Sequence, residues 1–181
     1  TNFTNGLIDD VRIYNYARTA GQIVEDMNAG HPLGGSPIGS QVGYWKFDDG
    51  YGTTAQDSSP HNNDMTLSTA TSAWTNSGKF GKAWDGNASR YVSRADDPDF
   101  DFLAAEDFTL TAWIKTDGTS PGAAEYIINK SSATAAGYGL YGTSTGKIVF
   151  AIDDDATWTP DDSIQSATNL YDTNWHHVTA R

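Results

Sequence analysis

Aspartate dominates the residues of this sequence that could do chemistry. Of the 23 acidic residues only three are glutamate, so 20 are aspartate, a short, hard oxygen donor that favours turns and suits Ca²⁺. The densest group, Asp153–Asp155 and Asp161–Asp162, brackets Trp158. An aromatic face can stack on a sugar ring while carboxylates accept hydrogen bonds from its hydroxyls. This pattern predicts a carbohydrate-binding loop formed by Trp158, Asp154, Asp155 and Asp161, with a solvated acidic turn as the alternative.

Catalysis is the competing interpretation, and the sequence argues against it. A glycosidase needs two carboxylates that flank the scissile bond, but Glu25, Glu106 and Glu125 are far apart and no Glu-x-Asp-x-x-Glu motif exists. Adjacent residues of a strand point to opposite faces, so His176 and His177 cannot hold one metal together. No Ser or Cys stands in a recognisable nucleophile motif. We therefore predict a protein that is not an enzyme.

The composition excludes further classes of function. The net charge of −12 and the pI near 4.4 argue against binding to nucleic acid or to an anionic membrane surface, which both require basic residues. No apolar run approaches the length that spans a membrane, which predicts no membrane insertion. The chain has no cysteine, so neither disulfides nor thiolate metal sites can form.

Short alternating segments predict the elements that must position these residues. Residues 107–116 place Phe108, Leu110, Ala112 and Ile114 on one face, which is typical of a half-buried strand. We expect further strands over 6–17, 42–48, 65–67, 79–85, 90–94, 126–130, 138–141, 147–152 and 175–180. Together they predict an all-β antiparallel sandwich.

One short helix is expected near the N-terminus. Thr19 and Gln22 have the spacing of a capping box, and Gly30 stands where a C-terminal cap would. Ile23, Val24 and Met27 give this helix one apolar stripe. Residues 31–41, HPLGGSPIGSQ, are typical of a linker.

Several dispersed blocks resemble a known family. GLIDDVRIYNYARTAGQI is similar to the closing segment of laminin-G-like, concanavalin-A-like jelly-roll domains of bacterial surface proteins, and YWKFDDG resembles their opening strand. KFGKAWDGNASRYV, DFTLTAWIKT and NWHHVTAR resemble internal blocks of the same family. The resemblance implies a jelly roll of concanavalin-A type.

The order of these blocks departs from that of the family, because the closing segment comes first. We expect residues 1–30 to be the closing strand and helix of a preceding repeat, 31–41 a linker, and 42–181 a laminin-G-like domain truncated at its C-terminal end. The alternative is a permuted unit in which residues 1–17 dock beside the strand at 43–48.

The resemblance also implies a structural calcium ion where the first and last strands meet. Its ligands would come from Asp9 or Asp10, from Asp48, and from the turn at Asp85 and Gly86, because Ca²⁺ takes carboxylate and backbone oxygens. A solvated acidic pair and an ordinary turn are the alternative.

Three functions remain in competition. The first is a non-catalytic, calcium-stabilised binding or adhesion repeat of a secreted or cell-surface protein that recognises carbohydrate or a cell-surface glycan. The second is a structural spacer or filament subunit that joins neighbouring repeats or copies through exposed strand edges. The third, a polysaccharide-degrading glycosidase, lacks the motif described above.

Overall fold

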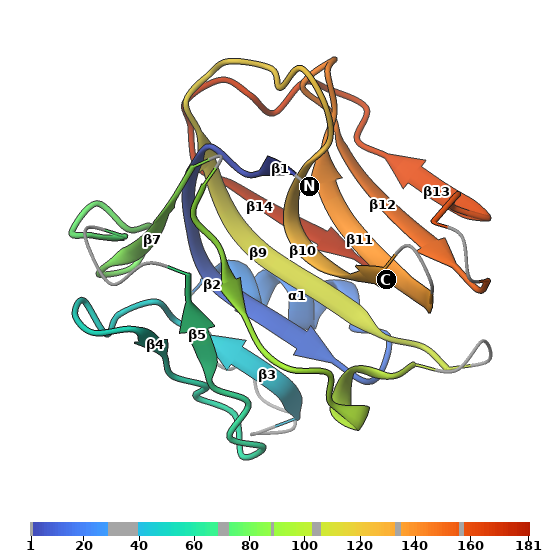
Figure 1. Cartoon of the computed structure of the whole chain (residues 1–181), viewed down its shortest axis with the longest axis horizontal. Helices are drawn as coiled ribbons and strands as arrows, with labels where there is room; N and C mark the ends of the chain where they lie inside the picture. The colour runs from blue at the N-terminus through green and yellow to red at the C-terminus, as the bar shows by residue number, and fades with distance from the viewer. Residues whose placement is uncertain are drawn as a thin grey trace.

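The computed structural model describes residues 2–28, 40–68, 73–87, 89–102, 106–132, 135–155 and 158–181. It is built almost entirely of antiparallel β-strands with one α-helix (Figure 1). The elements are β1 (Asn2–Phe3), β2 (Gly6–Tyr14), α1 (Ala20–Met27), β3 (Gln41–Trp45), β4 (Thr54–Ala55), β5 (Met65–Leu67), β6 (Trp74–Thr75), β7 (Ala83–Gly86), β8 (Val92–Ser93), the 3-10 turn η1 (Pro98–Phe100), β9 (Thr109–Thr116), β10 (Glu125–Ser132), β11 (Ala135–Gly142), β12 (Ile148–Asp153), β13 (Asp162–Gln165) and β14 (His176–Ala180).

Strand β2 lies at the centre of a six-stranded sheet. It pairs antiparallel with β9 along one edge and with β7 and β3 along the other, in the order β14-β9-β2-β7-β6 with β3 beside β2. Within this chain, therefore, the N-terminal strand docks beside the strand that begins at Gln41. The division into a preceding repeat, a linker and a truncated domain stays a prediction, and residues 29–39 of the predicted linker lie outside the described residues.

A five-stranded sheet, in the order β1-β10-β11-β12-β13, packs face to face against the six-stranded sheet. The core between them contains Leu110, Ala112 and Ile114 of β9 and Leu140 and Ile148 of the facing sheet. Phe108 joins the layers, because its ring lies 5.8 Å from that of Phe150 and 4.9 Å from that of Tyr138. The predicted sandwich is confirmed and Leu110, Ala112 and Ile114 face its core, but the strand is not half-buried as predicted, since Thr109, Thr111 and Trp113 on its other face are at most 7% exposed.

A three-stranded sheet, β4-β5-β8, continues the sandwich beside these layers. The turn that precedes β5 is organised by Asp57. Its carboxylate accepts hydrogen bonds from the backbone N–H groups of Tyr44, Ser59 and Asn63 at 2.7, 2.8 and 2.7 Å. Residues 57–64 thus form a turn in which one aspartate satisfies backbone donors of two segments.

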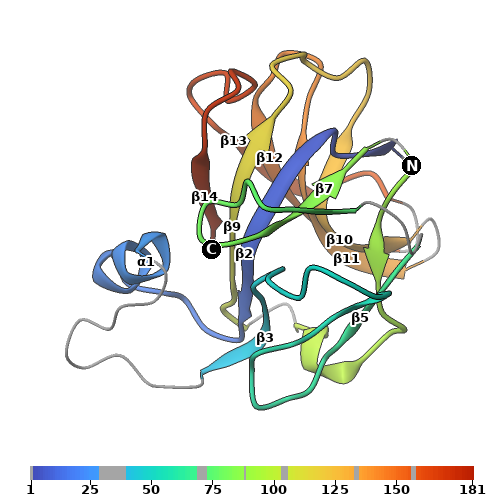
Figure 2. The same cartoon turned by 90° about the vertical axis from the view of Figure 1, so that its left-hand side faces the viewer.

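Helix α1 lies on the outer side of the six-stranded sheet, away from β10 and β11 (Figure 2). The capping box is confirmed, because Thr19 accepts from Gln22 N and the Gln22 side chain accepts from Thr19 N. The apolar stripe is not the buried face of the helix: Val24 and Met27 are 46% and 39% exposed, whereas Glu25 and Asp26 are buried. The C-cap is Asn28, and Gly30 lies outside the described residues.

Several element boundaries also differ from the sequence-based expectations; the strand expected over 79–85, for example, begins only at Ala83. The strand expected over 42–48 ends at Trp45, because Phe47 adopts a positive φ of 54° that breaks the pleat. The strand expected over 6–17 ends at Tyr14, where the chain turns toward α1. Strand β13 was not predicted, since its four residues are all exposed and carry little alternation.

Candidate functional site

Three side chains converge above Gly139, on the face of β11 that points away from the core. A Cβ placed on Gly139 would lie 3.2 Å from Tyr126 Cε1, 3.4 Å from Trp158 Cζ2 and 3.6 Å from Asn129 Oδ1. Glycine therefore leaves room for two aromatic rings to approach the backbone of the sheet. Tyr141 extends the group, with its ring centroid 5.2 Å from that of Tyr126. We call Tyr126, Asn129, Tyr141 and Trp158 the aromatic platform.

Strand register places this platform. Tyr126 pairs with Tyr141, and Asn129 pairs with Gly139, so all four positions share one face of the sheet. The neighbouring residues Tyr138 and Leu140 point to the opposite face, where they are buried in the core. The same alternation that fills the core thus presents the platform outward.

The β12–β13 loop brings Trp158 to the platform, and Asp153 organises that loop. This residue is 5% exposed, and its two carboxylate oxygens accept from Asp155 N at 3.1 Å and from Thr159 N at 2.7 Å. Asp161 N donates to the carbonyl of Ile152 at 3.0 Å. These bonds fix the backbone on both sides of Trp158, whose ring is half-buried over β11.

The other predicted sugar ligands, Asp154, Asp155 and Asp161, lie in this loop with exposed side chains. Asp161 Oδ2 accepts from Asp154 N at 2.9 Å. The negative charge of Asp161 raises the pKa of the Asp154 carboxyl. The loop thus offers several carboxylate acceptors next to the platform.

Sequence reasoning missed Tyr126, Asn129 and Tyr141 as members of the site. Strands were predicted over 126–130 and 138–141, but their pairing register was not, and a bulge between Tyr126 and Ile128 shifts it further. The available signal was Gly139 between two large residues, since glycine within a strand often marks a close approach of another group.

The predicted calcium ligands on β2 lie in two different environments. Asp9 is fully buried; its Oδ2 accepts from Phe80 N at 2.9 Å, and its Oδ1 has no hydrogen-bond partner. Burial raises the pKa of Asp9 to about 7, although the bond from Phe80 N opposes the rise. Asp10 adopts a φ of 49°, and its Oδ1 accepts from the Tyr44 hydroxyl at 2.5 Å and from Arg12 Nη2 at 3.3 Å.

The remaining predicted ligands are occupied by other groups of the chain. Asp48 Oδ1 accepts from Lys82 N at 2.8 Å, Asp85 forms an ion pair with Arg90 at 3.5 Å, and Gly86 pairs with Gly6. Within the described ranges no group of three or more His, Asp or Glu side chains could hold a metal ion. The five residues therefore do not form a single coordination sphere in this structure, and calcium binding stays a prediction. Among their side chains, Asp9 Oδ1 is the buried oxygen that has no hydrogen-bond partner.

The glutamates occupy three separate places. Glu25 is a buried residue of α1, with its Oε2 3.8 Å from Arg18 Nη2. Glu106 lies in the loop before β9, and Glu125 begins β10. Glu125 Oε2 accepts from the Tyr171 hydroxyl at 3.3 Å. His176 Nε2 donates to Asp172 Oδ1 at 2.7 Å, whereas the ring of His177 lies 5.3 Å from that of Trp113.

These layers define an antiparallel jelly-roll sandwich, and comparison with protein families agrees. The model of the concanavalin A-like lectin/glucanases superfamily, Laminin_G_3, matches residues 85–181, more than half of the chain. The chain belongs to this superfamily. No curated protein and no solved structure matches it. In the part of the chain that the structure describes, no helix has the length and apolar character needed to cross a membrane.

Proposed function

We propose that the protein is a non-catalytic carbohydrate-binding module of a secreted or cell-surface protein, and that the aromatic platform holds the sugar. The convergence of Tyr126, Trp158 and Asn129 above Gly139 carries this proposal. Stacked aromatic side chains present apolar faces to the C–H face of a sugar ring, and they lose little conformational entropy on binding. The superfamily contains lectins, and this supports the ligand class.

The polar groups around the platform would fix the orientation of the sugar. Asn129 Oδ1 accepts from the Ser131 hydroxyl at 2.6 Å, which leaves its amide N–H groups directed to other acceptors. Asp154, Asp155 and Asp161 would accept hydrogen bonds from sugar hydroxyls beyond Trp158. A neutral or basic glycan therefore fits this acidic surface better than an anionic one.

Replacing Trp158 with Ala is expected to weaken glycan binding about thirtyfold, because a buried aromatic anchor typically contributes about 2 kcal/mol. A glycan array would select the ligand, and titration calorimetry would measure its dissociation constant for each variant. Tyr51→Ala is the matched control, since Tyr51 is the most exposed aromatic side chain, at 80%, and lies outside the platform. Equal losses in both variants would contradict the assignment.

A glycine pair tests the same site without removing any group that touches sugar. Gly139→Ala would place a methyl group against both rings, whereas a Cβ on Gly122 would meet nothing within 4 Å. Only the first change is expected to weaken binding. If an intact, folded protein bound no glycan on the array, the proposed function would be wrong.

Calcium stabilisation is a separate part of the proposal. Calcium at one hundred times its dissociation constant would stabilise the fold by about 2.7 kcal/mol, so the Tm is expected to be several degrees higher in calcium than in chelator. Because Asp9 offers the unpartnered oxygen, Asp9→Asn is expected to abolish this difference. Scanning calorimetry of both proteins, with and without calcium, checks it; an identical Tm in calcium and chelator for the wild type would remove calcium from the proposal.

A structural repeat is the second candidate function. Strand β13 ends the five-stranded sheet as an exposed edge, and Ile164 on it is 70% exposed. An exposed edge with an apolar side chain is a template for pairing with another chain. If the glycan array shows no binding, this function becomes the favoured one.

A further inference from the structure

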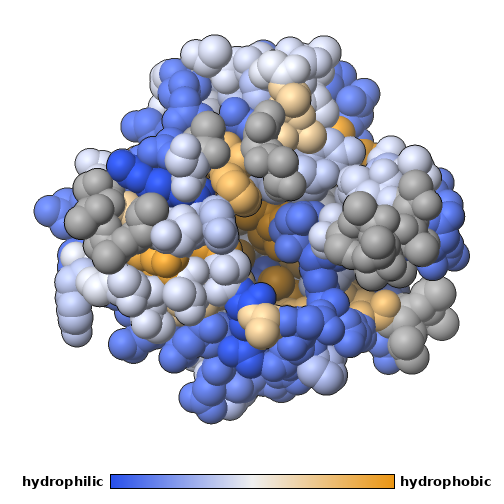
Figure 3. All heavy atoms as spheres, in the orientation of Figure 1, coloured by the Kyte–Doolittle hydropathy of each residue, from blue (hydrophilic) through white to orange (hydrophobic). Residues whose placement is uncertain are grey.

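A hollow lined by apolar residues opens between β8 and β10. Its volume is about 830 Å³. Residues 90–97 form one wall, residues 126–131 of β10 form the other, and the floor contains Ile8, Val11 and Ile13 of β2. In Figure 3 this floor is visible as the hydrophobic depression near the middle of the face. We call this feature the gap.

The gap is far larger than the voids that folded proteins keep. Protein interiors are packed as densely as organic crystals, and a dry apolar cavity of about 150 Å³ already binds small apolar molecules. The floor residues Ile8, Val11 and Ile13 belong to the main hydrophobic core and are at most 7% exposed. An occupant that covers them with apolar groups would complete this core.

Both walls of the gap are strand edges. Among the described residues, β8 has β5 as its one partner strand, and beyond Tyr126 strand β10 pairs with β11 alone. One end of the gap already holds a short strand, because β1 pairs in parallel with Glu125 and Tyr126 of β10. The ring of Phe3 crosses from β1 to stack on Tyr91 at 4.6 Å. At the other end, Lys130 bridges from β10 to Asp96 and Asp101 at 2.9 and 2.5 Å.

We propose that the gap accepts an extended peptide segment from another polypeptide chain, which pairs with β10 and fills the floor with apolar side chains at alternate positions. The pairing would continue, beyond Tyr126, the strand addition that β1 begins. The stretch between the β1 pair and Lys130 has room for roughly five residues at about 3.3 Å per residue. The segment would carry polar residues at the remaining positions, because Arg90, Arg94 and Lys130 also line the gap.

A peptide fits this gap better than a small apolar ligand does. A small molecule would cover Ile8, Val11 and Ile13 but would leave the N–H and C=O groups of the β10 edge without strand partners. A strand satisfies the edge and the floor together. This binding goes beyond carbohydrate recognition. Tyr126 and Asn129 belong to the aromatic platform and also line the gap, but Trp158 does not line it, so Trp158→Ala tests the sugar site alone.

Selection from a display library of random ten-residue peptides on the immobilised full chain tests the proposal. The expected result is at least tenfold enrichment of peptides with apolar residues at alternate positions, over selection on Ser93→Trp. Ser93 lines the gap and is exposed, so tryptophan there would fill the mouth. Ser163→Trp, on exposed β13 at the opposite end of the same sheet, is the matched control and should retain the peptides.

Hydrogen exchange then places the bound peptide. The selected peptide should slow exchange of the backbone amides of residues 127–130 and leave those of β13 unchanged. Should Ser93→Trp fail to fold, Ala95→Trp blocks the same mouth. Self-association of the chain that Ser93→Trp abolishes would support the proposal, with a second copy as the donor. Three results would overturn the proposal. The selected peptides could lack apolar residues at alternate positions, or they could bind without slowing amide exchange at residues 127–130. The third is that anilinonaphthalene sulfonate binds while no peptide is selected.

Discussion

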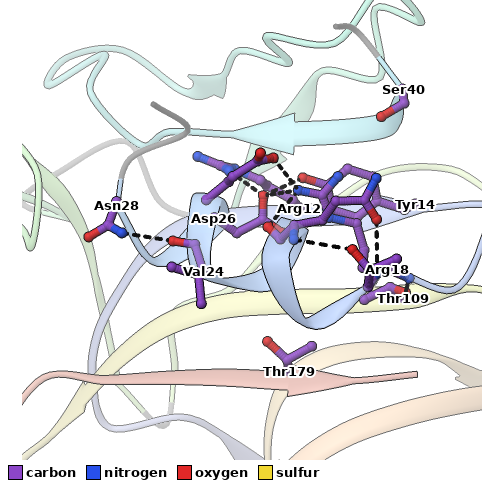
Figure 4. Close-up of polar contacts among 12 residues, drawn as sticks. Arg12, Tyr14, Arg18, Val24, Asp26, Asn28, Ser40, Thr109 and Thr179 are labelled. Atoms are coloured by element: carbon purple, nitrogen blue, oxygen red, sulfur yellow. Dashed lines mark hydrogen bonds and ion pairs between the residues drawn. The ribbon is translucent and has the colours of Figure 1, made fainter. Parts of the chain in front are cut away.

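Asp26→Asn is expected to destabilise the fold by about 3–5 kcal/mol, because it leaves two buried guanidinium groups without their shared counter-ion. Asp26 is 2% exposed, and its carboxylate accepts from Arg12 Nη1 at 2.6 Å, from the Tyr14 hydroxyl at 2.7 Å, and from Arg18 Nη2 and Nε at 2.8 and 3.0 Å. Figure 4 shows Arg12, Tyr14 and Arg18 gathered around this one helical side chain.

The ion pairs attach α1 to the six-stranded sheet. Arg12 and Tyr14 come from β2, whereas Asp26 comes from α1. The Arg12 guanidinium also lies 4.3 Å from the ring centroid of Tyr44 on β3, and Arg18 lies 4.2 Å from that of Tyr14. Removing one partner of such a buried group costs more than the pair contributes, since Arg12 and Arg18 stay buried with only their longer carboxylate contacts, to Asp10 at 3.3 Å and to Glu25 at 3.8 Å.

Thermal or urea unfolding measures the effect, and a Tm about 10 °C lower is expected for a chain of this size. Val24→Ala on the same helix is the control. Val24 is 46% exposed, so its truncation should change the free energy of unfolding by less than about 0.5 kcal/mol. If Val24→Ala cost more than Asp26→Asn, the helix would dock through its apolar stripe instead.

Helix α1, which buries a polar face and exposes Val24 and Met27, shows what sequence patterns cannot predict. Strand β9 could be predicted because four apolar side chains repeat with period 2, although the structure buries the alternate residues Thr109, Thr111 and Trp113 as well. The docking face of α1 could not be predicted, because Asp26 is buried only through its contacts with Arg12 and Arg18, which lie outside the helix. Periodicity detects apolar faces, and it has no signal for a polar face that is neutralised by distant charges.

The residues of the candidate site were also predictable only in part. Trp158 was predicted because a tryptophan in an acidic loop has no periodic role in the core. Tyr126 and Tyr141 were hidden within predicted strands, where only the pairing of Asn129 with Gly139 assigns them to the outer face. The family resemblance implied Asp9 or Asp10 as a calcium ligand, and a bulge between Asp9 and Arg12 together with the positive φ of Asp10 separates the two carboxylates. Register and bulges depend on tertiary pairing, which one sequence does not display.

The ionisation of Asp9 is expected to have the second large effect on stability. Its carboxyl has a pKa of about 7 in the folded state and about 3.9 in the unfolded chain, so it is protonated far more readily in the folded state. Protonation therefore favours the folded state. The stabilising contribution is complete below about pH 4 and is lost as the pH rises from about 4 to about 7. The three-unit difference corresponds to at most about 4 kcal/mol, and roughly 2–4 kcal/mol is expected.

Asp9→Asn should therefore raise stability at pH 8 in chelator and flatten the pH dependence between 4 and 7. Other titrating groups near Asp9 act differently: burial lowers the pKa of His177, on the far side of Trp113, to about 4, so its contribution is lost as the pH falls below about 6.5. Comparing the variant with the wild type at each pH cancels the contribution of His177. Urea unfolding from pH 4 to 8 measures the difference, with Asp107→Asn at an exposed position as the control. A parallel pair of pH curves for wild type and Asp9→Asn would mean that Asp9 stays ionised in the fold, with its unpartnered oxygen satisfied by a bound cation or water.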